Sequence, residues 1–109
     1  MQPVCAVNEL EEDQARGIEI DGKSVVLVKK DGQVHAYLNW CPHLGIELNF
    51  MPDQFLDSDN AFLMCANHGA LFEIDSGHCL SGPCSGDALM KVDVTIEGDQ
   101  ILLGDIPTP

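Results

Sequence analysis

The sequence has few basic residues and no long apolar segment. Five Lys and Arg stand against 18 Asp and Glu, which gives a formal net charge of −13. A nucleic-acid backbone or an anionic membrane would repel such a chain, so we expect neither as a partner. No apolar run approaches the roughly 18 residues that a membrane-spanning helix requires. The charge instead favours a protein partner that docks a basic surface.

The sequence also lacks a secretory signal and an even set of cysteines. Residues 1–5 have neither the basic start nor the apolar block of a signal peptide, so we expect a cytoplasmic protein. The five cysteines are Cys5, Cys41, Cys65, Cys79 and Cys84. An odd number in a reducing compartment favours metal or redox chemistry over a disulfide framework. A disulfide between Cys79 and Cys84 remains an alternative, although free thiols are favoured.

At 109 residues with 45% hydrophobic composition, the chain predicts a single folded domain over residues 1–109. Short segments rich in branched residues alternate with Gly and Asp turn signals, which predicts an all-β chain of hairpins. These segments cover residues 24–28, 33–38, 61–64, 70–74, 92–96 and 100–103. Asp31-Gly32 joins the first two as a hairpin turn. Only residues 7–16 predict a helical turn or two, with Asn8 as the cap.

Two short motifs outside these strands carry metal-binding side chains. They are Cys41-Pro42-His43-Leu44-Gly45 and Cys65-Ala66-Asn67-His68-Gly69. Each offers one thiolate and one imidazole next to a glycine, which lets backbone amides approach a bridging sulfide closely. Two kinds of metal centre, a zinc ion or a pair of bridged irons, can bind to a set of two Cys and two His. Zinc sites usually pair Cys with Cys and His with His, whereas mixed pairs favour two bridged irons with both Cys on one and both His on the other.

Residues 39–45 together with residues 65–72 resemble the ligand motifs of the Rieske 2Fe-2S family, and the resemblance covers nearly the whole chain. It implies stacked antiparallel sheets with a cluster-binding loop subdomain over about residues 40–88. Residues 81–84, Ser-Gly-Pro-Cys, resemble the third, proline-containing loop of the family, which covers the cluster. A relative that has lost its cluster is disfavoured because all four ligand positions are filled.

The resemblance implies one 2Fe-2S cluster per chain and a complete set of residues to bind it. The ligands would be Cys41, His43, Cys65 and His68, with Leu44, Gly45, Gly69, Gly82 and Pro83 around the cluster. Both cysteines would bind the buried ferric iron. Both histidines would bind the outer iron, which becomes ferrous on reduction, and would face solvent or a partner.

This chain departs from the high-potential members of the family at four positions. Respiratory members join the two ligand loops by a disulfide, at positions where this sequence has Ile46 and Asn67. They also place a Ser and a Tyr hydroxyl near the cluster, where this sequence has Ala70 and Phe72. Hydrogen bonds to sulfur stabilise the reduced cluster, so we expect a low potential, roughly −150 to 0 mV.

These features predict a soluble one-electron carrier that passes electrons from a flavoprotein reductase to an oxygenase or similar terminal enzyme. We do not expect an enzyme, because a Rieske cluster is coordinatively saturated and only His35 and His78 remain as further histidines. Two alternatives stay open. One is an accessory subunit of a larger oxidoreductase such as a nitrite reductase, with an apolar interface. The other is a redox-sensing binding module.

Overall fold

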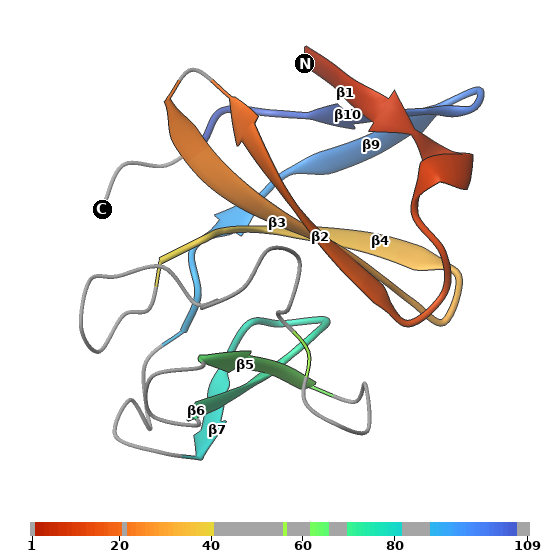
Figure 1. Cartoon of the computed structure of the whole chain (residues 1–109). Coiled ribbons are helices and arrows are strands. Elements are labelled where there is room, and N and C mark those ends of the chain that lie inside the picture. The colour runs from red at the N-terminus through yellow and green to blue at the C-terminus, as the bar shows by residue number, and fades with distance from the viewer. Residues whose placement is uncertain are drawn as a thin grey trace.

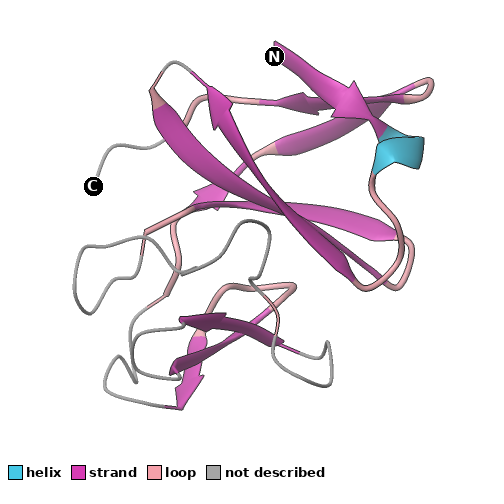
Figure 2. Cartoon of the chain, viewed as in Figure 1, coloured by secondary structure: helices cyan, strands magenta, loops and turns pink. Residues whose placement is uncertain are grey.

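Three antiparallel sheets stack in layers in the computed structural model (Figure 1, Figure 2). The structure describes residues 2–20, 22–40, 56, 62–65, 70–81 and 88–106. The first sheet has the strand order β1-β10-β9, the central sheet β2-β3-β4-β8 and the small sheet β5-β6-β7. The strands are β1 (Gln2–Ala6), β2 (Gln14–Ile20), β3 (Lys23–Lys30), β4 (Gln33–Leu38), β5 (Phe62–Cys65), β6 (Ala70–Glu73), β7 (Cys79–Ser81), β8 (Lys91–Val92), β9 (Val94–Glu97) and β10 (Gln100–Leu103). The predicted all-β class is confirmed.

The central strand β3 supplies side chains to both faces of its sheet. Val25–Val28 are all fully buried, because a strand covered on both faces needs a continuous apolar run. Two separate cores result. The β10 core, between the first and central sheets, consists of Leu10, Ile20, Val25, Leu27, Ala36, Val92, Ile101 and Leu103. The β6 core, between the central and small sheets, consists of Ala15, Val26, Val28, Tyr37, Leu63, Ala70, Phe72, Ile74, Cys79 and Leu89.

The predicted hairpin of β3 and β4 is confirmed, with Asp31 and Gly32 at its turn. Their φ angles are 53° and 74°, the two positive values that a type I′ turn requires. The Glu12 carboxylate accepts hydrogen bonds from the backbone N–H groups of Asp31 and Gly32, the latter at 3.0 Å. The turn is therefore fixed by its own sequence and by the hydrogen bonds to Glu12.

The helical prediction for residues 7–16 is wrong apart from one short turn. Only Val7–Glu9 form a 3-10 helix (η1), and its N-cap is Ala6 rather than Asn8. The Val7 N–H donates to the Asp99 carbonyl at 2.7 Å, and β2 begins at Gln14 to pair with β3. Tertiary pairing prevails because so short a helix has little stability of its own. Across the described ranges, no helix has the length and apolar character needed to cross a membrane.

Candidate metal centre

The first ligand motif follows a firmly held segment at the end of β4. Asn39 is buried, and its backbone N–H donates to the Ser24 carbonyl at 2.9 Å. Its side-chain Nδ2 donates to the Ser24 hydroxyl at 3.1 Å. The Trp40 N–H donates to the Leu38 carbonyl at 2.8 Å. These bonds fix the chain directly before Cys41 onto the central sheet.

The second ligand motif starts inside the small sheet. Cys65 is the last residue of β5 and pairs with Ala70, the first residue of β6. Only residues 66–69, which include His68 and Gly69, separate these paired positions. The sequence therefore places a cysteine and a histidine of one motif next to a fixed strand end.

The proline-containing segment starts at the same end of the small sheet. β7 ends at Ser81, which pairs with Leu71 near the beginning of β6. Because both neighbours of β6 run antiparallel to it, β5 and β7 both end where β6 begins. Ser81, the last described residue before Gly82 and Pro83, therefore lies at the same end of the small sheet as Cys65.

Of the nine predicted site residues, only Cys65 is described, and by its strand alone. The others lie outside the described residues: Cys41, His43, Leu44, Gly45, His68, Gly69, Gly82 and Pro83. Their roles stay predictions, and the alternative of a Cys79–Cys84 disulfide stays untested because Cys84 lies outside the described residues. The donor chemistry fits a Rieske cluster, since two thiolates and two imidazoles are its ligand set. When bound, such a cluster supplies reversible one-electron transfer.

The two positions expected to tune the cluster lie on one face of β6. Ala70 and Phe72 are fully buried members of the β6 core, whereas Leu71 between them is only partly buried. Ala70 also pairs with Cys65, one of the predicted ligands. The buried face of β6 thus offers no hydroxyl beside the second ligand motif.

The structure adds Tyr37, which the sequence placed only in a strand. Its side chain is fully buried, and its hydroxyl donates to the Ile74 carbonyl at 2.5 Å. Burial raises the pKa of Tyr37 to about 12, with Asp75 and Glu73 adding to the effect. It is the only tyrosine in the chain, within a run of otherwise apolar buried positions, and that was the signal available in the sequence.

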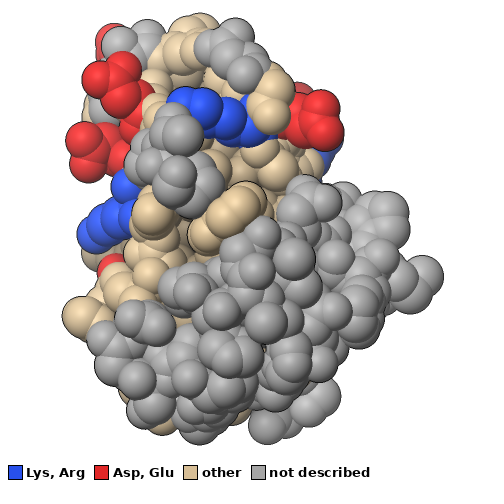
Figure 3. Space-filling view, turned by 90° about the vertical axis from the view of Figure 1, so that its left-hand side faces the viewer, with Lys and Arg blue, Asp and Glu red and all other residues tan. Residues whose placement is uncertain are grey.

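The few basic side chains are largely occupied by contacts within the molecule. Arg16 lies 3.6 Å from Glu9, and Lys30 lies 2.7 Å from Asp13. The Lys23 ammonium donates to the Ile106 carbonyl at 3.0 Å. On the face shown in Figure 3, acidic side chains flank the basic ones in the upper part of the molecule. The five basic side chains are already counted in the net charge of −13, so the molecule as a whole is strongly negative.

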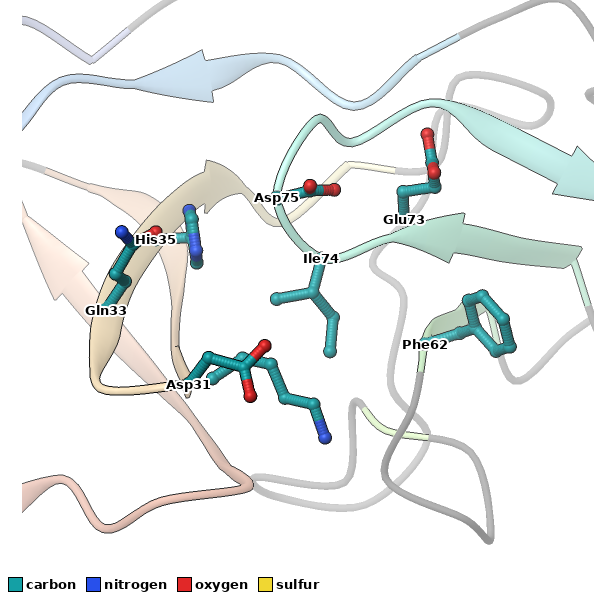
Figure 4. A pocket seen from close by; sticks show the side chains of 8 residues that line it. Asp31, Gln33, His35, Phe62, Glu73, Ile74 and Asp75 are labelled. Atoms are coloured by element: carbon teal, nitrogen blue, oxygen red, sulfur yellow. The ribbon is translucent and has the colours of Figure 1, made fainter.

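A polar pocket of about 280 Å³ lies at the other end of β4, near the hairpin turn (Figure 4). His35 and Asp75 line it from facing elements, together with Asp31 and Glu73. Burial lowers the pKa of the half-buried His35; Lys91 adds to the effect and Asp75 opposes it. The pocket borders Gln33 at the start of β4, whereas Trp40, the last described residue before Cys41, follows the opposite end of that strand.

Comparison with known families decides the class of protein. Residues 1–99 match the Rieske [2Fe-2S] domain family. The chain belongs to this family. The expected Rieske fold and 2Fe-2S cofactor are thereby confirmed, and this Rieske protein is an electron carrier rather than an enzyme.

Individual relatives agree with the family. The ferredoxin component of the alkene monooxygenase system of Xanthobacter autotrophicus is 29% identical over 97% of this chain and 82% of that protein. Mouse apoptosis-inducing factor 3 is 35% identical over 92% of this chain but only 16% of that protein. The ferredoxin of carbazole 1,9a-dioxygenase from Nocardioides aromaticivorans shares the fold, with a TM-score of 0.76, 23% identity, and coverage of 99% of this chain and 100% of that one.

Proposed function

We propose that this Rieske protein is a ferredoxin that accepts one electron from a flavoprotein reductase and delivers it to a terminal oxygenase. Cys41 and Cys65 would hold the inner iron of its cluster, and His43 and His68 the outer iron. The observation that carries the proposal is the family match together with near-complete coverage of a monooxygenase ferredoxin component. The cytoplasmic location belongs to the same proposal.

The fold supports this ligand set from the described strand ends. Hydrogen bonds to Ser24 hold the chain before Cys41, while the pairing of Cys65 with Ala70 holds the chain before His68. A metal centre requires ligands held on rigid elements; the first motif follows the hydrogen-bonded Asn39 and Trp40 after β4, and the second begins on β5. The buried Ala70 and Phe72, which carry no hydroxyl, support a potential in the lower part of the Rieske range.

The decisive experiment is electron paramagnetic resonance of the purified protein after reduction with dithionite. A Rieske-type signal of low average g value, with two irons per chain, is expected. A colourless protein that contains zinc, or one without metal, would contradict the proposal. Size-exclusion chromatography of the protein from its native host then separates the carrier from an accessory subunit. A carrier elutes alone, whereas permanent co-elution with a large oxidoreductase would favour the subunit.

The acidic surface supports a partner with a basic docking surface. With five basic against 18 acidic side chains, the molecule carries a strongly negative net charge, and a field of that sign attracts a basic surface. Electron transfer between the reductase and this protein should therefore slow markedly from 0.01 to 0.15 M salt, as the Debye length falls from about 30 to about 8 Å. An uncharged small redox mediator is the control, because its rate has no charge attraction to lose. A salt-independent rate with the reductase would refute charge-guided docking.

A further inference from the structure

The Tyr37 side chain connects two parts of the molecule that adjoin different ligand motifs. Tyr37 lies in β4, four residues before Cys41. Its hydroxyl donates to the carbonyl of Ile74, the residue that directly follows β6. β6 in turn pairs with Cys65 at the start of the second motif. One buried hydrogen bond thus links the strand before the first motif to the strand after the second.

The segment that follows Gly82 and Pro83 in the sequence is bonded to Gly77, which contacts the same ring. A Cβ atom at Gly77 would lie 2.8 Å from Cε1 of Tyr37 and 3.4 Å from Cβ of Leu89, so Gly77 packs closely against both residues. The Leu89 N–H donates to the Gly77 carbonyl at 2.8 Å, and the Leu38 N–H donates to the Met90 carbonyl at 2.8 Å. Residues 88–90 therefore close on β4 and on the turn after β6 at one point.

We propose that Tyr37 is a positioning residue for the cluster, because it fixes the relative placement of the chain segments that flank the three cluster-binding motifs. The proposal rests on the ligand set given above. A cluster with ligands from separate motifs tolerates only about 0.5 Å of relative displacement. The Tyr37 hydroxyl holds the central and small sheets at one separation, and the Gly77 backbone presses against its ring.

The test compares cluster retention in wild type, Tyr37→Phe and Ile101→Val. Tyr37→Phe removes one hydroxyl and keeps the ring. Ile101→Val trims a fully buried side chain of the β10 core, and its stability cost is similar to that of losing one hydrogen bond. Each protein is isolated with its cluster and exposed to an iron chelator while visible absorbance is recorded. Thermal unfolding and the paramagnetic resonance spectrum of the reduced protein are measured on the same samples.

Tyr37→Phe should lose its absorbance about fivefold faster than wild type, the factor that one hydrogen bond of average strength corresponds to. Its resonance lines should broaden, since the ligand pairs are no longer held at one separation. Ile101→Val should retain the wild-type rate and spectrum despite a lower unfolding temperature. Equal rates in Tyr37→Phe and wild type, or equally fast loss in Ile101→Val, would overturn the proposal. Absence of a cluster from wild type would instead refute the proposed function.

Discussion

The two cores share the central sheet but are closed in different ways. On the β10 side, β1, β9 and β10, which are four or five residues long, close the core with aliphatic side chains. On the β6 side, strands of three or four residues close the core around Tyr37 and Phe72. The predicted ligand motifs adjoin only these short strands and the end of β4. We therefore expect the β10 side to be stable by itself and the β6 side to depend on the cofactor for its stability.

Removing a ligand should have the largest effect on the β6 side and little effect on the β10 side. Replacement of Cys41 or Cys65 by Ser, or of His43 or His68 by Ala, should abolish the visible absorption completely, because each removes one of the four bonds that hold the irons. Hydrogen exchange should then speed up in β5, β6 and β7 while β2 and β3 stay protected, since metal binding is coupled to local folding.

Cys5→Ser is the matched control for the ligand variants. Cys5 is half-buried in β1 beside the β10 core and far in sequence from both motifs. It should keep the full absorption of wild type. Full cluster content in any of the four ligand variants would show that the residue replaced is not a ligand.

Truncating one leucine in each core should lower stability equally but affect cluster retention only on the β6 side. Leu63 in the β6 core and Leu103 in the β10 core are both essentially buried, so Leu63→Ala and Leu103→Ala should each cost about 2–5 kcal/mol of unfolding free energy. Only Leu63→Ala should also accelerate cluster loss, because it loosens the contact between the small and central sheets. Denaturant unfolding and chelator-induced bleaching measure the two effects. Equal bleaching in both variants would mean that the cores are not independent.

A pair of glycines isolates the contact with Tyr37. Gly77 and Gly98 both have positive φ, at 77° and 61°, so alanine is strained by a similar amount at either position. An added Cβ at Gly98 meets nothing within 4 Å, whereas at Gly77 it meets the Tyr37 ring at 2.8 Å. Gly77→Ala should therefore be less stable than Gly98→Ala by about 1–3 kcal/mol in denaturant unfolding. Equal stabilities would show that the Tyr37 ring can move aside freely.

Local chemistry explains which parts of the fold the sequence could predict. Asp31-Gly32 specifies its own turn, and segments rich in branched residues specify β3, β4, β5, β6 and β10, so these predictions are confirmed. The single strand predicted over residues 92–96 is wrong, because β8 and β9 divide this segment between two sheets. The helical prediction for residues 7–16 failed because Val7 bonds to Asp99, a residue far away in the sequence. The role of Tyr37 was hidden for the same reason, since its partners Ile74, Gly77 and Leu89 are brought to it only by the stacking of sheets. The ligand motifs could be recognised because their residue types alone carry the chemistry.

The smallest expected effect concerns a single oxygen atom on the buried face of β6. Ala70→Ser and Phe72→Tyr should each raise the midpoint potential, because a hydroxyl that donates to sulfur stabilises the reduced cluster. A hydrogen bond worth about 1 kcal/mol corresponds to a shift of about 40 mV in a one-electron couple. Ala36→Ser is the matched control, since Ala36 is equally buried but belongs to the β10 core. Protein-film voltammetry that finds equal shifts in Ala70→Ser and Ala36→Ser would mean that the potential responds to general destabilisation. A shift confined to β6 would instead show that the small sheet sets the potential through the residue paired with Cys65.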